Sequence, residues 1–229
     1  MSVSTIAVIG GTGALGRGLG FRFSAAGHPV VLGSRSADRA ATAAAELAGR
    51  LTDPAAGVVS GAENAKAAEA ADVVVLAVPY AGHAELVSGL AGPLAGKVVI
   101  SCVNPLGFDK LGPFGLAVPE GSAAEHAAAL LPDSQVVAAF HHVSAVTLLG
   151  DGAGLADQDV LVCGDDPDAR ATVVELAAAV TGRAGIEVGP LRLARQLEPL
   201  TAVLISINKR YKAHSGVRIS GLPHGTDRH

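Results

Sequence analysis

The stretch IAVIGGTGALGRGL, residues 6–19, constrains the fold of this chain more than any other segment. It begins as an apolar, β-branched run, breaks at closely spaced glycines and continues with helix-forming residues. Within it, Gly11, Gly13 and Gly16 satisfy the pattern G-x-G-x-x-G. Between a strand and a helix, such glycines allow a tight turn, the approach of a pyrophosphate and close packing of helix on strand. The stretch therefore predicts a nucleotide-binding turn, and the alternative is a purely structural glycine turn.

The rest of the N-terminal part alternates between short β-branched runs and Ala-rich helical stretches, which is typical of a parallel sheet with crossover helices. Six strand-like runs precede residue 141, and they are TIAVIG, PVVLGS, GVVSG, ADVVVLAVP, GKVVISCVN and SQVVAAF. Six is the number of strands in a dinucleotide-binding sheet. We therefore expect an α/β fold with a Rossmann-type doubly wound parallel sheet.

The pattern changes after Phe140, where Gly and Asp signals replace the strand-like runs. Two more strand-like runs, DVLVCGD and IEVGPL, flank an Ala/Val-rich helix, and a long helical segment follows from Arg192 to about His214. We expect residues 1–140 to form the Rossmann domain and residues 141–222 to form a small C-terminal α/β extension that closes a cleft. Residues 223–229 are expected to be a flexible tail.

Composition excludes several other classes of protein. The 229 residues, 49% of them hydrophobic, are enough for a sizeable core, and a net charge of -4 argues against nucleic acid as a partner. The longest apolar stretch, ADVVVLAVPYAG, is too short to span a bilayer, and the N-terminus lacks the basic region of a signal peptide. Cys102 and Cys163 lie in strand-like runs without metal-ligand spacing, so we expect buried thiols and a cytoplasmic protein.

The end of the second strand indicates which dinucleotide the chain binds. An NAD-binding sheet usually has Asp or Glu there, about 20 residues after the glycines. Here the chain reads VVLGSRSADR, which supplies Ser34, Arg35 and Arg39. Guanidinium groups match a phosphate, and cations at a helix N-terminus oppose the helix dipole unless an anion is present. These residues favour NADP over NAD, and the alternative is the solvated start of a helix.

Two other strand ends are candidate ligand contacts, because ligands bind beyond the carboxyl ends of parallel strands. Val78 and Pro79 end the fourth strand, where they form an apolar wall on the nicotinamide side or simply stop the strand. Asn104 follows the fifth strand, either as a ligand contact or as a turn residue.

Two adjacent histidines, His141 and His142, follow the sixth strand. Strand alternation would place them on opposite faces, so that one of them faces the cleft. No metal site is expected, because neither histidine has a suitably spaced further ligand. A histidine here orients a substrate, handles a proton near neutral pH or is structural. Tyr80 and Tyr211 do not form the Tyr-x-x-x-Lys pattern of many dehydrogenases, which favours a reaction that needs positioning more than a strong acid.

The last helical segment carries a local excess of positive charge in an acidic protein. Between residues 189 and 220, Glu198 is the single carboxylate in the sequence, and the basic residues are Arg192, Arg195, Lys209, Arg210, Lys212 and Arg218. They form a solvated helix face or receive an anionic substrate tail. The apolar stretch LTAVLISI in this segment packs against its own chain or pairs with a second copy in a homodimer.

Several motifs together resemble the F420-dependent NADP oxidoreductases, which are NADPH-dependent reductases of the deazaflavin coenzyme F420. These motifs are AVIGGTGALGRGL, VVLGSR, AFHHVSA, VCGDD and GPL, the last followed by the long closing helix. The resemblance extends over nearly the whole chain. It implies an enzyme that transfers a hydride directly between C4 of the nicotinamide and C5 of the deazaflavin, with both rings in the cleft between the two parts.

The resemblance also assigns individual residues. It implies a pyrophosphate loop formed by Thr12, Gly13, Ala14 and Leu15, to which the glycine pattern adds Gly11 and Gly16. It also implies a 2′-phosphate site formed by Ser34, Arg35 and Arg39. It further implies a nicotinamide side with Val78 and Ala145, to which the strand end adds Pro79. On the deazaflavin side it implies catalytic positions at His141 and Val143 and a closing contact at Ser215 and Gly216. The alternatives are an NADP-dependent imine or β-hydroxyacid reductase, which usually has a larger helical domain, and a non-catalytic NADPH sensor.

Overall fold

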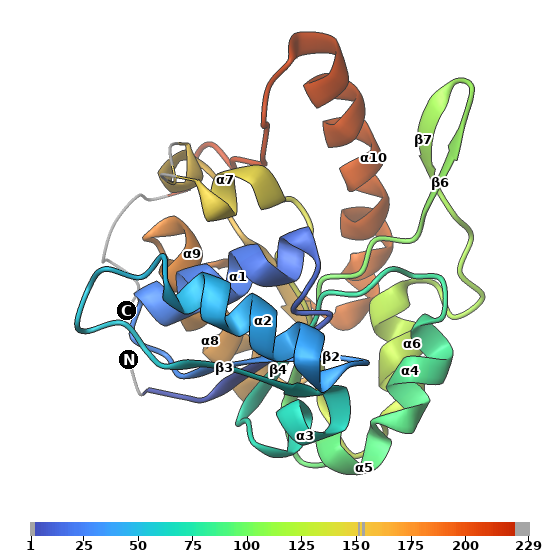
Figure 1. The fold of residues 1–229 in the computed structure, drawn as a ribbon. Coiled ribbons are helices and arrows are strands. Elements are labelled where there is room, and N and C mark those ends of the chain that lie inside the picture. Colours follow the sequence, from blue (N-terminus) through green and yellow to red (C-terminus); the bar gives the residue numbers. More distant parts are fainter. Residues whose placement is uncertain (1–2, 151, 153, 223–229) are drawn as a thin grey trace.

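The structure is a computed structural model that describes residues 3–150, 152 and 154–222. One eight-stranded sheet lies between two groups of helices, and a separate hairpin projects from the body (Figure 1). The strands are β1 (Ile6–Ile9), β2 (Val30–Ser34), β3 (Val59–Glu63), β4 (Val73–Leu76), β5 (Val98–Ser101), β6 (Leu106–Asp109), β7 (Gly112–Gly115), β8 (Gln135–Ala138), β9 (Leu161–Gly164) and β10 (Ile186–Gly189). The α-helices are α1 (Ala14–Ala25), α2 (Ala37–Ala48), α3 (Asn64–Glu69), α4 (His83–Gly89), α5 (Ala91–Leu94), α6 (Ala123–Leu130), α7 (Ala145–Leu149), α8 (Pro167–Leu176), α9 (Ala178–Thr181) and α10 (Ala194–Tyr211). Two short 3₁₀ helices are η1 (Leu155–Asp157) and η2 (Leu191–Leu193).

The order of the strands in the large sheet is β10-β9-β8-β5-β4-β1-β2-β3. From β3 to β8 every neighbouring pair is parallel, so that six strands have their carboxyl ends at one edge. β9 runs antiparallel to β8, and β10 runs parallel to β9. After β1 the chain adds β2 and β3 on one side, and it then crosses back to add β4 on the other side of β1. The strand order therefore reverses between β1 and β4, and ligands of open α/β sheets bind beyond the strand ends at such a point.

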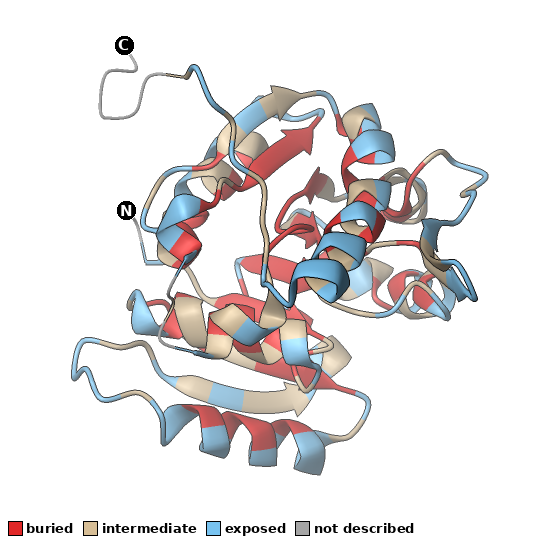
Figure 2. Ribbon diagram, turned by 90° about the horizontal axis from the view of Figure 1, so that it is seen from above, coloured by how far each residue is buried: buried red, intermediate tan, exposed pale blue. Residues whose placement is uncertain are grey.

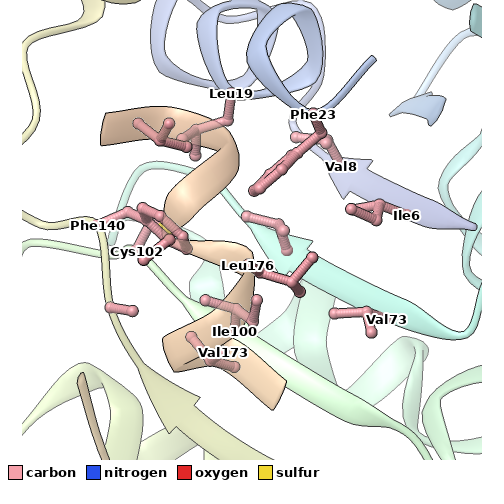
Figure 3. Close-up of a cluster of buried hydrophobic side chains, with 14 of the residues drawn as sticks. Ile6, Val8, Leu19, Phe23, Val73, Ile100, Cys102, Phe140, Val173 and Leu176 are labelled. Carbon is pink, nitrogen blue, oxygen red and sulfur yellow. The ribbon is translucent and has the colours of Figure 1, made fainter. Parts of the chain in front are cut away.

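Alternate residues of the strands supply the two faces of the core, as the pleat of a β-strand requires. On one face, Ile6 and Val8 of β1 pack under α1, where Leu19 and Phe23 are fully buried (Figure 3). On the other face, Ala7 and Ile9 belong to a second buried cluster with α3, α4, α5 and α6. Burying both faces fixes the register of β1, because a shift by one residue would exchange its two apolar sets.

The hairpin of β6 and β7 and the last turns of α10 project from the body side by side (Figure 1). A Cβ atom on Gly115 of β7 would lie 2.8 Å from the Cβ of Pro199, so the base of the hairpin packs closely on α10. Figure 2 shows that the outer turns of α10 are largely exposed. No sequence pattern predicts this hairpin, because its runs LGFD and GPFG contain no β-branched residue.

The fold class is confirmed, since six parallel strands in Rossmann order are flanked by helices on both faces. The two strands of the C-terminal part, β9 and β10, extend the same sheet. The division at residue 140 stays a prediction, and the expected tail of residues 223–229 lies outside the described residues. No helix in the described part of the chain combines the length and the apolarity needed to cross a membrane.

Candidate functional site

The glycine turn joins β1 to α1 at the carboxyl edge of the sheet. Gly10 has φ 82°, and a Cβ atom there would lie 2.5 Å from the carbonyl oxygen of Ala77. Gly16 packs α1 onto this turn, since its Cβ would lie 2.5 Å from the carbonyl oxygen of Gly10. Gly13 is the N-cap of α1 and has no capping side chain, and the first turn has no acidic residue. The N-terminal amides of α1 are therefore available to an anion.

A cavity of about 780 Å³ lies over this turn and the neighbouring strand ends. This volume is in the usual range for a small-molecule site, roughly 300–1,000 Å³. Its lining includes the predicted residues Thr12, Gly13, Ser34, Arg35, Arg39, Val78 and Pro79. The lining also includes residues that the sequence did not single out, namely Gly10, Glu63, Asn64, Ala65, Ala77, Ala81, Gly82, Glu85, Leu86, Gly89 and Leu90. Most of these follow β3 and β4, so their position at strand ends was the available signal.

The predicted 2′-phosphate residues lie together at one end of β2. Ser34 is buried as the last residue of the strand, whereas Arg35 and Arg39 are exposed. Ser36 caps α2 by accepting a hydrogen bond from the Arg39 amide. Within the part of the chain that the structure describes, neither guanidinium has a hydrogen-bond or ion-pair partner. Two unpaired cations beside a helix N-terminus and in one cavity give this end of the cavity a positive charge, and guanidinium groups match the geometry of a phosphate.

The segment after β8 is held in an unusual backbone conformation. Phe140 has φ 62° although it is not glycine, and its buried ring contacts Phe23 edge to face with centroids 5.9 Å apart. Because β8 ends at Ala138 and Phe140 turns the chain, strand alternation does not apply to the two histidines that follow. The expectation that they lie on opposite faces of a strand was wrong. Both are buried, with ring centroids 6.0 Å apart.

The backbone of His141 is bound by side chains from two other elements. Asn104 Nδ2, after β5, donates to the His141 carbonyl oxygen at 3.2 Å, and Thr201 Oγ1 of α10 lies 3.1 Å from the same oxygen. Thr201 Oγ1 also lies 3.2 Å from Asn104 Oδ1. Asn104 is thus more than a turn residue, because it links the ends of β5 and β8 to α10.

The two imidazole rings have different surroundings. His142 Nε2 lies 2.7 Å from the carbonyl oxygen of Leu197 in α10 and therefore donates to it. Neither ring nitrogen of His141 has a hydrogen-bond partner, although the residue is only 5% exposed. Burial, together with the nearby His142, lowers the pKa of His141 to about 3. His141 is therefore neutral at pH 7, which favours the alternatives in which it orients a ligand or is structural over the one in which it handles a proton.

The first turns of α10 are anchored to α6 by charged groups. Glu198 accepts hydrogen bonds from the amides of Ala123 and Ala124 at 2.8 and 3.0 Å, at the N-terminus of α6. Arg195 forms a bidentate ion pair with Glu125 of α6. Burial raises the pKa of Glu198 to about 7, against the opposing effect of the two amides. This clamp fixes the root of α10 beside the carboxyl edge of the sheet.

The short helix α7, which begins with Ala145, is docked on α1. A Cβ on Gly18 would lie 2.6 Å from Leu148 Cβ, so glycine at this position permits the contact. Arg22 donates hydrogen bonds to the carbonyl oxygens of Thr147, Leu148 and Gly150 at the end of α7. Val143, just before α7, is buried in the same hydrophobic cluster as Leu148 of α7 and Leu19 of α1.

The chain reverses after α10 and returns along the body. Lys212 has φ 51° at this reversal, and Asn208 Oδ1 accepts hydrogen bonds from the amide and the hydroxyl of Ser215, both at 2.7 Å. Gly216 lies against Gln158, where a Cβ would be 2.3 Å from Oε1. Ser215 and Gly216 are therefore fixed to α10 and to the segment before β9.

The structure therefore places the predicted site residues in two groups. Seven of them line the 780 Å³ cavity together. The others are described by the structure but do not line it, and they are Gly11, Ala14, Leu15, Gly16, His141, Val143, Ala145, Ser215 and Gly216. Gly11 is buried against β2, where a Cβ would lie 2.9 Å from Leu32. The assignment of these residues to a binding site stays a prediction.

Comparison with known proteins found relatives that match nearly the whole chain. Residues 5–105 match the model of a family described as NADP oxidoreductase, coenzyme F420-dependent. The chain is 41% identical to an F420-dependent NADP reductase of Methanothermobacter thermautotrophicus, over 96% of this chain and 97% of the relative. It is 37% identical to a protein of the same name from Methanocaldococcus jannaschii, over 95% of this chain and 98% of the relative. A solved structure from Arthrobacter sp. FB24, provisionally described as an F420-dependent NADP reductase, is 30% identical with a TM-score of 0.76, and covers 92% of this chain and 96% of that one.

Proposed function

The chain belongs to the coenzyme F420-dependent NADP oxidoreductase family, and from this premise we propose how its residues serve the reaction. The protein is an oxidoreductase that transfers a hydride between NADPH and coenzyme F420. Two substrates must therefore lie against the same edge of the sheet. The observation that carries the assignment of residues is the cavity that brings the glycine turn, two unpaired arginines and an apolar wall together.

NADP fits this cavity by charge and by shape. The pyrophosphate lies on the N-terminal amides of α1, next to Thr12 and Gly13, since no side chain fills that space. Arg35 and Arg39 bind the 2′-phosphate with the hydroxyl of Ser34. Val78 and Pro79 form the apolar wall for the nicotinamide half, and we assign Ala145, the first residue of α7, to the same half.

The deazaflavin binds beside His141 and Val143, and Ser215 with Gly216 closes that side. This assignment is supported by the ring of His141, whose two nitrogen atoms are buried without a partner. A buried polar group without a hydrogen bond is costly, and a ligand that bonds to the ring removes that cost. The backbone of His141 is held at the same time by Asn104 and Thr201.

When both substrates are bound, the nicotinamide supplies or accepts a hydride at C4, and the deazaflavin exchanges it at C5. The chain contributes position rather than acid–base chemistry. His141 is neutral at pH 7 because burial lowers the pKa of its ring to about 3, so the ring orients a ligand as a neutral donor or acceptor. The buried apolar side chains around it, such as Val143, exclude water from that side.

The test is the change in the visible absorbance of oxidised F420 when NADPH and the protein are added together. We expect the band to disappear with NADPH and to persist without protein. Reduction of an imine or a keto acid, with no effect on F420, would favour the rival reductases. NADPH binding without turnover of any acceptor would favour a sensor.

We also propose a homodimer. Ten large apolar side chains are exposed in the described part of the chain, and seven of them belong to the hairpin region and α10: Phe108, Leu111, Phe114, Leu116, Val203, Ile207 and Tyr211. Such a concentration of apolar surface is typical of an interface. Light scattering should give a dimer for the wild type and a monomer for Leu111→Glu with Ile207→Glu, whereas Val58→Glu, on an exposed residue elsewhere, should remain dimeric. A monomeric wild type would contradict the proposal.

A cytoplasmic location is proposed on the state of the cysteines. Cys102 and Cys163 are both buried free thiols. Burial raises the pKa of Cys163 to about 12, and that of Cys102 beyond the usual range. Unreactive free thiols are typical of proteins in a reducing compartment.

A further inference from the structure

We propose that Thr201 and Asn208 of α10 are positioning residues for the deazaflavin side of the site, together with Asn104 after β5. This inference rests on the proposed function, because it concerns the segments to which we assign deazaflavin binding. It adds residues that need not touch either substrate. Their role is to hold the backbone of two separate segments in place.

One face of α10 carries both side chains. Thr201 and Asn208 are seven residues apart, which is close to two turns of an α-helix and places them in one line along its surface. Thr201 bonds to the carbonyl oxygen of His141, and Asn208 bonds to the amide and hydroxyl of Ser215. A single helix face thus holds the backbone of both segments.

The bond at Thr201 controls a strained segment. The left-handed conformation of Phe140, at φ 62°, is unfavourable for a residue with a side chain and persists only where the surroundings hold it. The surroundings here are the Phe23 ring, the bonds of Asn104 and Thr201 to the next carbonyl, and the bond from His142 to Leu197. Without Thr201 and Asn104, the carbonyl of His141 would lose both of its side-chain donors.

The ring of His141 is the group that this arrangement would orient. Its backbone is fixed from two sides, whereas its ring nitrogens have no partner. A group that is held by its backbone and free at its polar atoms is pre-organised for a ligand. At the other segment, Asn208 Oδ1 accepts hydrogen bonds from both the amide and the hydroxyl of Ser215, so the backbone of Ser215 is fixed as well.

The attachment of α10 to the body does not depend on the hydrogen bonds of Thr201 and Asn208. The root of α10 is already fixed by Glu198 and Arg195, upstream of Thr201. Loss of the Thr201 or Asn208 side chain should therefore leave α10 attached to the body. The change should be local to the segments at His141 and Ser215.

The test compares Thr201→Val, which keeps the shape and removes the hydroxyl, with Asn208→Leu. Thr201→Ser restores the hydroxyl, and Ser206→Ala is the matched control, because the Ser206 hydroxyl bonds only within α10 to the carbonyl oxygen of Ala202. The dissociation constant of F420 is measured by deazaflavin fluorescence, and that of NADPH by titration calorimetry. Steady-state kinetics then separate the KM values of the two substrates.

We expect Thr201→Val and Asn208→Leu each to raise the dissociation constant of F420 by about 10-fold, with NADPH binding unchanged within about twofold. Each loss corresponds to about 1.4 kcal/mol. Thr201→Ser and Ser206→Ala should bind F420 like the wild type. Unchanged F420 binding in both Thr201→Val and Asn208→Leu, or equal weakening for F420 and NADPH, would overturn the proposal. A wild type that binds no F420 would instead overturn the proposed function.

Discussion

Replacement of Arg35 and Arg39 by alanine tests the phosphate site at the end of β2. Both side chains line the cavity and have no partner in the described part of the chain. A hydrogen bond from a charged group contributes roughly 1.5–3 kcal/mol, and exposure and non-additivity reduce the sum. We expect the double variant to lose about 2–4 kcal/mol of NADPH binding, a rise of roughly 30- to 1,000-fold in the dissociation constant.

The assay is titration calorimetry with NADPH and with NADH. NADH lacks the 2′-phosphate, so its affinity should change by less than about threefold. The matched control is Lys110→Ala with Arg192→Ala, which removes the same charge from exposed residues outside the cavity lining. Equal losses for NADPH and NADH in the double variant would refute the phosphate assignment, and so would an equal loss in the control.

Four further changes test other parts of the site. Gly13→Val adds a side chain where the pyrophosphate should lie, so NADPH binding should fall at least 10-fold in a protein that still unfolds cooperatively; unchanged affinity would exclude the loop. His141→Ala should slow single-turnover hydride transfer by about 10-fold. The wild-type rate should not change from pH 6 to 8, because the lowered pKa of His141, about 3, keeps the ring neutral. A rate that follows a pKa near 6.5 would contradict this. The pKa of Glu198 is raised to about 7 in the fold, so the folded protein keeps this proton where the unfolded chain loses it. The free energy of unfolding should therefore decrease by up to about 3 kcal/mol as the pH rises from about 4.5 to 7. Urea unfolding of Glu198→Gln should lack that dependence on pH. Neutralising Lys209 and Lys212 should raise the KM for F420 and weaken its salt dependence without affecting NADPH, and equal KM values in both forms would show that these cations do not meet the substrate tail.

The sheet could be predicted from the sequence because its signals are local. β1 and β4 are short runs of buried apolar residues, and the glycines after β1 mark the start of α1. The cavity followed from the same logic, since Ser34, Arg35 and Val78 all stand where parallel strands end.

Other features depend on contacts between distant residues. The left-handed conformation of Phe140 is fixed by tertiary packing and has no sequence signal, so alternation misplaced the two histidines that follow. The hydrogen bond of Thr201 joins α10 to His141, which is 60 residues earlier in the chain. The hydrogen bonds of Asn208 join α10 to Ser215, which is 7 residues later and follows the reversal of the chain. Gly10 was passed over because the pattern G-x-G-x-x-G begins at Gly11, although the positive φ lies at Gly10.

The central claim is direct hydride transfer between the two substrates on this chain. It is tested by single-turnover reduction of F420 with NADPH that carries deuterium at the transferred position of C4. We expect the deuterium to appear at C5 of reduced F420, with a primary isotope effect on the loss of deazaflavin absorbance. Deuterium released to water, or no reduction of F420 at all, would contradict the account.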